Sequence, residues 1–449
     1  MTAAAPVRVI SMPPPTVTTV KRSRVELLLE PTLFYGTFAL LAFGPLAFGA
    51  VQPWAIFTLE VGAAVLFLAW SIKQLLAGAV TIRSSPAFAP MLLFLIVASS
   101  QLLSGGTAYR YATATQIAQY LAYGALSFVA LQALDSPRAP VRFARLLSWF
   151  GFAVSVFAII QGFTSPGKLY WVHTPSFGGW IYGPYVNHNH YAGLMEMLAP
   201  IPLVLCLTDQ VRGAKKFLFA FASLLMAATI FTSGSRGGMI AFAIEAALIA
   251  ALLLRRSKSP ASMLTASAFT LLLAGLIAWT AWSTVASRWQ EVRLTRGMEL
   301  SVSSRLAIDK DALRMFAARP MGWGLGNFPT VYPQFRSFFT DMYVNAAHND
   351  YLQMLVETGV LGAIPILWFL FVLFRAGVRL LNLGVPHVPG FSTSPNDLIE
   401  QPFAVAALIG CTGVLVHSLV DFNLQIPANA ALFYVLSVIA TSHPRRAAE

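Results

Sequence analysis

The chain carries little charge and almost no cysteine. Only 11% of its 449 residues are charged and two are cysteines, whereas 57% are hydrophobic. Because soluble domains carry about 25% charged residues, this composition argues against a soluble globular protein. Cys206 and Cys411 both lie in apolar stretches, where a cysteine behaves as a small buried apolar side chain. A disulfide framework and a zinc site are therefore not indicated.

The chain has instead a series of apolar stretches, each about as long as the roughly 20 residues that span a bilayer as a helix. A helix satisfies its own backbone hydrogen bonds in lipid. We therefore predict an all-α, polytopic integral membrane protein with about 12 transmembrane helices. The predicted helices cover residues 32–51, 55–77, 87–104, 111–133, 142–163, 190–208, 215–233, 237–254, 262–282, 350–374, 403–421 and 426–441.

The positive charge is distributed as in a multi-pass membrane protein. With the N-terminus in the cytoplasm, the cytoplasmic segments hold most of the 30 lysines and arginines, and the short outer loops hold few. This matches the positive-inside rule and places both termini in the cytoplasm. The net charge of +12 is then a signal of topology, and we expect no nucleic-acid partner.

The predicted topology divides the chain into five parts. Residues 1–30 are basic, show no cleavable signal peptide, and are expected to form a disordered cytoplasmic tail. The other parts are transmembrane helices 1–9 with an outer loop at 164–189 (31–282), a large, partly helical periplasmic loop (283–349), transmembrane helices 10–12 (350–441) and a cytoplasmic tail (442–449).

Part of the large outer loop has helical periodicity between Ser303 and Ala318. Arg319-Pro320 would end this helix, and the glycine-rich run at 322–326 predicts a flexible turn. The apolar residues of the helix recur at helical spacing and should form one packed face: Leu306, Leu313, Phe316 and Ala317.

Arg236 lies in a Ser-Gly-Ser-Arg-Gly-Gly run (233–238) at the outer ends of two apolar helices. One interpretation is an arginine that extends its charge to the membrane interface from a turn. The other is an anion site, because glycines allow close approach, the following helix offers free N–H groups, and a guanidinium binds two oxygens at once. We favour the second interpretation, with a diphosphate as the ligand.

Arg305 opens the helix of the outer loop. It could form a solvated i, i+4 pair with Asp309, an arrangement of little energetic value. It could equally bind the same diphosphate as Arg236. The run Asp309-Lys310-Asp311 has the spacing of a divalent-cation motif. Carboxylates two residues apart on a helix point in different directions, however, so we expect a solvated surface and no metal site.

His348 stands where the polar loop meets an apolar helix. One interpretation is a histidine that caps this helix. The other is a general base, because a helix N-terminus favours the neutral imidazole that can accept a proton. The helix carries a polar stripe, at Asp350, Gln353 and Glu357, which could stabilise packing or support a site. Gly359 and Gly362 further along suit close helix–helix contact.

Two further pairs are candidates for substrate contact or for support of the site. His188 and His190 flank Asn189 at the end of the outer loop 164–189. A metal site would need further ligands, so substrate contact or packing is the better interpretation. His417 and Asp421 lie four residues apart at the outer end of one helix and could share a hydrogen bond.

These motifs resemble those of the bacterial O-antigen ligase and polysaccharide polymerase superfamily. The ligase signature is His, then Asn, Ser or Gln, nine residues, Gly, two residues, and Gly, Thr or Tyr. His348, Asn349, Gly359 and Gly362 satisfy it.

The runs at 187–190, 235–238 and 304–306 are similar to the same superfamily, as is the layout of helices with one large late outer loop. The run 417–423 looks more like the polymerase or exopolysaccharide branch.

The resemblance implies a polytopic, GT-C-like glycosyltransferase of the bacterial inner membrane with a periplasmic active site. Such enzymes take a glycan from an undecaprenyl diphosphate carrier and use no metal and no cofactor. Ligases transfer it to the lipid A core, polymerases to another carrier-linked chain, and some relatives to protein. By this resemblance Arg236 and Arg305 match the diphosphate-binding arginines and His348 the catalytic histidine.

We therefore expect an inverting, metal-independent transfer from the lipid-linked donor to an acceptor hydroxyl. An exopolysaccharide or O-antigen polymerase is the alternative within the family. A flippase or transporter of lipid-linked glycans is the alternative of another class, which predicts charged residues deep in several spans and broken helices. We expect the remaining candidates to contact substrate or to support the site: His188, His190, Asn349, Asp350, Glu357, His417 and Asp421.

Overall fold

The computed structural model describes residues 24–165, 167–175, 180–208, 210–256, 302–340, 343–382 and 401–442. In these ranges the fold is all-helical, as predicted, with only two isolated β-bridges, Leu169–His173 and Tyr182–Tyr185. The helices are α1 (Arg24–Leu46), α2 (Pro53–Ala77), α3 (Phe88–Leu103), α4 (Arg110–Ala133), α5 (Ala139–Thr164), α6 (His188–Leu198), α7 (Pro200–Leu207), α8 (Lys215–Ser233), α9 (Arg236–Arg256), α11 (Val302–Ala318), α12 (Phe328–Val331), α13 (Asp350–Asn382), α14 (Pro402–His417) and α15 (Pro427–Thr441).

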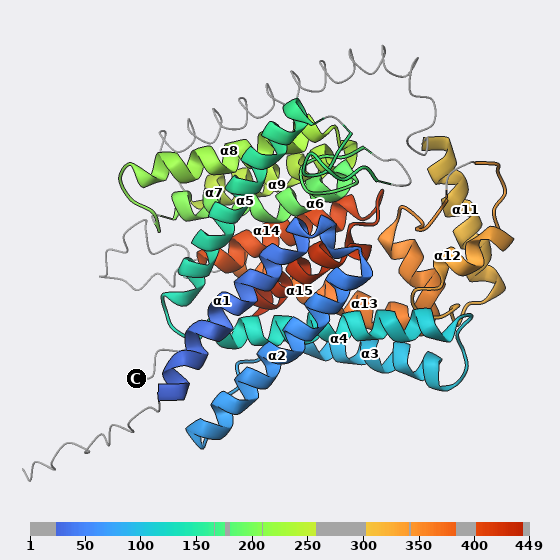
Figure 1. Cartoon of the computed structure of the whole chain (residues 1–449), viewed down its shortest axis with the longest axis horizontal. Coiled ribbons are helices and arrows are strands. Elements are labelled where there is room, and N and C mark those ends of the chain that lie inside the picture. The colour runs from blue at the N-terminus through green and yellow to red at the C-terminus, as the bar shows by residue number, and fades with distance from the viewer. Residues whose placement is uncertain are drawn as a thin grey trace, which may run out of the picture.

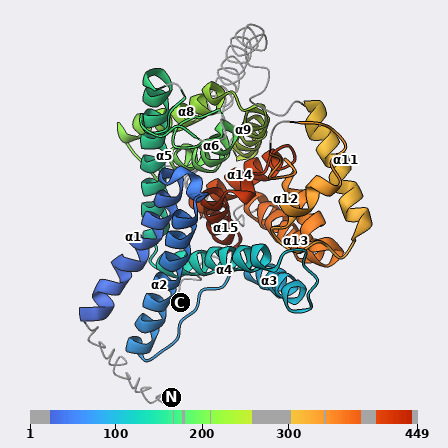
Figure 2. The ribbon, with the colours of Figure 1, turned by 45° about the vertical axis from the view of Figure 1, so that its right-hand side comes forward.

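The last two helices of the chain, α14 and α15, form the centre of the bundle (Figure 1). α14 packs against α6, α7 and α9, and α15 packs against α1, α4 and α14. Most of their residues are small or branched apolar residues, and nearly all are buried. Helices α1, α2 and α5 lie on one side of this centre, and α11 and α12 lie on the other (Figure 2).

Several helices have the length and composition of membrane spans. Five described stretches are long and apolar enough to cross a bilayer: Pro53–Ala77, Ala139–Thr164, His188–Leu207, Lys215–Ser233 and Asp350–Leu380. Helices α3, α14 and α15 are apolar but shorter. These helices support a multi-pass membrane protein. The predicted span at 262–282 lies outside the described residues, and the number of twelve spans stays a prediction.

One element boundary differs from the predicted one. α1 begins at Arg24, inside the segment expected to be a disordered tail, because residues 25–30 are mainly leucine and glutamate, which favour a helix. The span predicted at 190–208 is found as one apolar stretch, His188–Leu207, in which Ala199 separates α6 from α7. Pro200 and Pro202 follow the junction, and each lacks the backbone donor that a continuous helix needs.

α11 confirms the helix predicted at 303–318, but a different face is packed. Leu306 and Leu313 are 56% and 52% exposed. The opposite face is buried and forms a small core with α12 and residues 344–356. It consists of Ile308, Asp311, Ala312 and Met315. Of the predicted face, Phe316 packs against this core, whereas Leu306 and Leu313 do not. The prediction missed the buried stripe because it includes an aspartate, which a hydrophobic pattern assigns to solvent.

Asp311 is an anchor of this loop rather than a solvated residue. Its carboxylate accepts hydrogen bonds from the Ser337 backbone N–H (3.0 Å), the Tyr332 hydroxyl (3.2 Å) and the Arg314 guanidinium. Burial alone would raise the pKa of Asp311, but these bonds outweigh burial and lower it. The solvated interpretation of Asp309-Lys310-Asp311 is therefore wrong for Asp311.

α13 is broken at Gly359, whose φ of +67° and ψ of −167° are not helical. The break exposes backbone groups to the turn at 322–326, where the Gly324 N–H donates to the carbonyl of Glu357 (2.8 Å). A Cβ atom on Gly359 would lie 2.6 Å from the backbone nitrogen of Gly322. Gly359 thus approaches a turn and not another helix, which corrects its predicted role. The turn predicted to be flexible is fixed to α13.

Candidate active site

His348 lies directly before α13 in an uncommon backbone conformation. Its φ of +54° falls in the left-handed region, which non-glycine residues seldom adopt and which is frequent at functional sites. The side chain is 11% exposed, and Nδ1 lies 3.3 Å from Oδ1 of Asp421. This contact is an ion pair when the imidazole is protonated, although it lacks the geometry of a hydrogen bond.

Arg305 meets the same aspartate from α11. Its Nη1 lies 3.8 Å from Oδ2 of Asp421 and donates a hydrogen bond to the carbonyl of Val420 (2.8 Å). No pair with Asp309 forms among the described contacts, so that interpretation of Arg305 is wrong. The side chain of Arg305 is 26% exposed, which leaves part of the guanidinium open to a ligand. Asp421 therefore stands between Arg305 and His348.

Asp421 is fully buried, yet its surroundings favour the ionised form. Burial alone would raise its pKa, but the adjacent His348 and the positive charge of Arg305 outweigh burial and hold the pKa of Asp421 well below its usual range. Asp421 also accepts a hydrogen bond from the backbone N–H of Phe422 (2.9 Å). A carboxyl group that favours its ionised form thus lies between two candidate site residues.

Arg236 is the first residue of α9, and it is exposed. Ser235 caps this helix, since its hydroxyl accepts a hydrogen bond from the Gly238 N–H (3.1 Å). A Cβ atom on Gly237 would lie 3.0 Å from the side chain of Val420. The turn of Arg236 therefore touches the residue whose carbonyl binds Arg305. The structure brings Arg305 and His348 to the segment 420–422, and the turn that carries Arg236 lies next to Val420.

His417 lies against the turn that carries Arg236. Its Nδ1 lies 2.7 Å from Oε1 of Glu196 on α6, and both side chains are buried. Its Nε2 lies 3.5 Å from the Ser235 hydroxyl, and a Cβ on Gly237 would lie 2.6 Å from the same nitrogen. The predicted hydrogen bond between the side chains of His417 and Asp421 is absent among the described contacts. The backbone N–H of Asp421 donates to the carbonyl of His417 (3.1 Å), whereas the imidazole is turned to Glu196 and Ser235.

The two histidines of α6 differ in their surroundings. His188 Nδ1 lies 2.8 Å from the carbonyl oxygen of Ser233, and its ring stacks on Trp180 at 4.7 Å. His190 stands edge-on to Phe422 at 4.6 Å between ring centroids. Phe422 also makes an edge contact with His348, at 4.8 Å between ring centroids. His190 therefore belongs to the group around segment 420–422, whereas His188 is held beside the Arg236 turn.

The polar residues at the start of α13 are held by structural hydrogen bonds. Asn349 caps the helix, since its side-chain oxygen accepts from the Leu352 N–H (3.1 Å). Asp350 accepts three hydrogen bonds from residues 418–425: from the Ser418 hydroxyl (2.8 Å), the Leu424 N–H (3.0 Å) and the Gln425 amide (3.1 Å). These contacts favour the interpretation in which the stripe stabilises packing.

Glu357, two residues before the break in α13, binds the segment 326–328 of the outer loop. It accepts hydrogen bonds from the backbone N–H groups of Gly326 (2.7 Å) and Phe328 (3.0 Å), and from the Gln353 amide (3.3 Å). It therefore fixes α12 to α13. Glu357 shares no described contact with His348.

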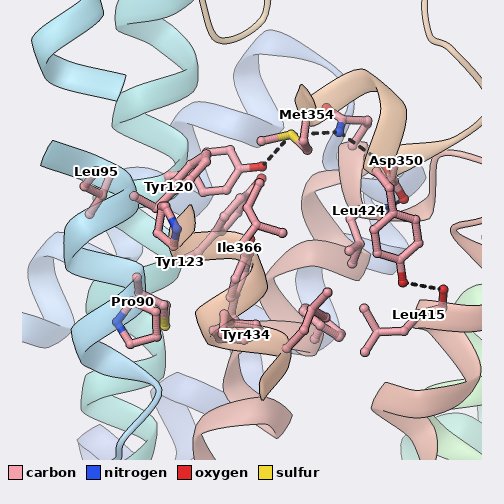
Figure 3. Close-up of a pocket in the computed structure, with 18 residues that line it drawn as sticks. Pro90, Leu95, Tyr120, Tyr123, Asp350, Met354, Ile366, Leu415, Leu424 and Tyr434 are labelled. Atoms are coloured by element: carbon pink, nitrogen blue, oxygen red, sulfur yellow. Dashed lines mark hydrogen bonds between the residues drawn. The ribbon is translucent and has the colours of Figure 1, made fainter. Parts of the chain in front are cut away.

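An apolar cavity lies beside this site, between α3, α4, α13 and α15 (Figure 3). Its empty volume is about 820 Å³, part of which is open to the outside. Asp350, two residues after His348, lines one end, and Pro90 lies at the opposite side of the view. The wall between them is formed by aromatic and aliphatic side chains, among them Tyr120, Tyr434 and Ile366. The cavity thus runs from the site along apolar helices.

The fold and this site define an all-helical, multi-pass membrane protein with cationic groups gathered at the ends of its helices. The family model described as O-antigen ligase matches residues 221–367. This match supports a place for the chain in the O-antigen ligase-related superfamily, as its motifs indicated, and with it a membrane glycosyltransferase activity of the ligase or polymerase kind. A search of curated proteins found no match.

The matched region includes Arg236, Arg305 and His348 but ends before Asp421. Glu196, the partner of His417, is an acid within an apolar stretch and belongs to none of the motifs. A contact across more than 200 residues leaves no local signal by which it could have been found.

Proposed function

We propose that the protein transfers a saccharide from undecaprenyl diphosphate to an acceptor hydroxyl at the periplasmic face of the bacterial inner membrane, as an O-antigen ligase does. The observation that carries this proposal is the position of Asp421, 3.3 Å from His348 and 3.8 Å from Arg305. One carboxylate thereby lies between the candidate general base and an arginine that could bind the diphosphate.

In the proposed reaction His348 accepts the proton of the acceptor hydroxyl. Asp421 faces Nδ1 of the imidazole, which leaves Nε2 to face the hydroxyl, and it stabilises the imidazolium that forms. The acceptor oxygen forms a bond to the anomeric carbon as the bond from that carbon to the diphosphate breaks. Attack from the side opposite the leaving group inverts the anomeric configuration.

The arginines stabilise the departing undecaprenyl diphosphate, whose negative charge grows in the transition state. Arg236 is exposed at the N-terminus of α9, where helix N–H groups also favour an anion. Arg305 binds the Val420 carbonyl with one nitrogen, and its partly exposed guanidinium has further donors. These two side chains supply the charge stabilisation in a metal-independent mechanism.

The apolar cavity beside Asp350 suits part of the hydrocarbon chain of the donor. It is lined mainly by apolar side chains, and its lining includes Asp350, two residues after His348 in the chain. Burial of apolar surface stabilises binding by about 25 cal/mol per Å². This arrangement would hold the lipid along the helices while its diphosphate faces the arginines.

The polymerase alternative uses the same chemistry with a carrier-linked glycan as acceptor. The observation that favours it is the run 417–423, which resembles that branch and lies in the site through His417 and Asp421. A flippase is favoured by the break at Gly359 and by Glu196 and Glu245, which are 0% exposed within apolar helices.

Reconstitution in nanodiscs with a carrier-linked glycan from the producing cells tests these alternatives. The products are identified by mass with lipid A core and a second carrier-linked glycan as competing acceptors. A new glycosidic bond is expected, and its acceptor separates ligase from polymerase. Movement of labelled lipid across liposomes without any new bond would contradict the proposal and favour the flippase.

A further inference from the structure

A group of buried polar atoms around Phe422 has no hydrogen-bond partner in the described part of the chain. The atoms are His190 Nε2, Asp309 Oδ1, His348 Nδ1 and Asp421 Oδ2. About 90% or more of buried polar groups in proteins are hydrogen-bonded, so each exception calls for an explanation. Four exceptions in one place point to a ligand or to ordered water.

The four residues come from distant parts of the sequence, and three of them, His190, His348 and Asp421, share contacts at segment 421–422. His190 and His348 stand edge-on to Phe422 at 4.6 and 4.8 Å. Asp421, the preceding residue, lies 3.3 Å from His348 and interacts electrostatically with His190. Asp309 on α11 interacts electrostatically with His348. The orphan atoms are therefore grouped between α6, α11 and the turn after α14.

The chemistry of these atoms selects the kind of ligand. Two carboxylates accept hydrogen bonds and repel an anion, which excludes the diphosphate from this position. A saccharide hydroxyl donates to a carboxylate and can also accept from an imidazole N–H. Burial raises the pKa of Asp309, an effect that the neighbouring His348 opposes. A hydroxyl would provide the hydrogen bond that the protein does not.

We propose that His190, Asp309 and Asp421 form a subsite for the hydroxyl groups of the acceptor saccharide, next to His348. The inference rests on the proposed function and adds the acceptor side to it. Asp309 and Asp421 accept hydrogen bonds from sugar hydroxyls, and His190 Nε2 binds a further hydroxyl. The subsite places the reacting oxygen against His348.

The test is a comparison of Michaelis constants in nanodiscs. Donor glycan is kept saturating while two acceptor probes, lipid A core and a second carrier-linked glycan, are titrated separately. For the probe that wild type uses, His190→Gln and Asp309→Asn should each raise the acceptor KM about tenfold, as the loss of one hydrogen bond to a charged or buried group implies. The donor KM should stay within about twofold of wild type.

Matched variants separate binding from folding. His173→Gln makes the same change in an exposed histidine of the outer loop and should leave both constants unchanged. Asp309→Glu keeps the carboxylate and should restore part of the acceptor KM, which a purely structural role would not predict.

Different results would contradict the subsite and the proposed function. If wild type transfers glycan while His190→Gln and Asp309→Asn keep a wild-type acceptor KM, the subsite is wrong and the orphan atoms bind water only. If wild type transfers from no diphosphate-linked donor to either probe, the proposed function is wrong and the subsite with it.

Discussion

Asp350 and Asp421 are both almost completely buried, at 3% and 0% exposure, but their surroundings are opposite in kind. Asp350 accepts three hydrogen bonds and joins α13 to segment 418–425. Asp421 accepts one, from its neighbour Phe422, and faces two candidate site residues with Oδ2 left without a hydrogen bond. Burial alone therefore does not separate a structural acid from a functional one. For Asp350 and Asp421, the number of hydrogen bonds that the carboxylate accepts distinguishes the two roles.

The histidines repeat this difference. His417 is bound by Glu196 and lies against the Arg236 turn, whereas His190 keeps a nitrogen without a partner among the described residues. The His417–Glu196 pair and the hydrogen bonds of Asp350 fix the turn of Arg236 and the start of α13. Groups with free bonding capacity gather around Phe422.

The largest effect is expected for the residues around Phe422, whose substitution should slow glycan transfer. Asp421→Asn should lower the transfer rate at saturating substrates by about 100-fold or more, because general base catalysis contributes about 10²–10⁴-fold and Asp421 orients the base. His348→Ala should be at least as severe. Initial rates in nanodiscs measure both. Near-normal rates in properly folded Asp421→Asn would remove Asp421 from the mechanism.

Substitution of Asp350 should instead lower the stability of the protein. Asp350→Ala leaves the Ser418, Leu424 and Gln425 donors without their acceptor and should destabilise the protein by about 2 kcal/mol, since each buried unsatisfied group costs about 1–3 kcal/mol. Thermal unfolding in detergent measures the loss. Leu313→Ala, on the exposed face of α11, should change stability by less than about 0.5 kcal/mol. Equal effects of the two variants would show that the Asp350 contacts are not structural.

Arg236→Lys should have a smaller effect that is confined to the donor. A lysine keeps the charge but cannot bind two oxygens at once, so kcat/KM for the donor should fall about tenfold. Arg138→Lys, at an exposed position before α5, is the control and should be neutral. Full activity of Arg236→Lys would leave Arg236 as an interfacial charge, the interpretation that the sequence also allows.

The smallest effect expected is a pH dependence from the loop anchor Asp311. Its folded pKa is lowered, so its ionisation stabilises the fold above the unfolded pKa of about 3.9 and this contribution is lost as the pH falls through the folded value. Asp311→Asn should therefore be less stable than wild type at neutral pH. The difference in melting temperature should shrink below about pH 4, and a difference that grows there would contradict the assignment.

The sequence predicted what depends on local pattern. Apolar runs located the helices, and the motifs around Arg236, Arg305 and His348 marked residues that the structure brings to one segment. Contacts between distant residues were not predictable in the same way, such as His417 with Glu196. The packed face of α11 was missed because a bonded aspartate lies in it. The break at Gly359 was missed because a glycine in an apolar helix is also typical of helix–helix contact.

Binding of undecaprenyl diphosphate, measured by native mass spectrometry, tests the central claim most directly. Wild type should bind the lipid, His348→Ala should bind it with similar affinity, and the double variant Arg236→Gln/Arg305→Gln should bind it at least tenfold more weakly, as the loss of two charge-assisted contacts implies. Wild-type affinity in the double variant would contradict the account, because the two arginines would then not hold the diphosphate.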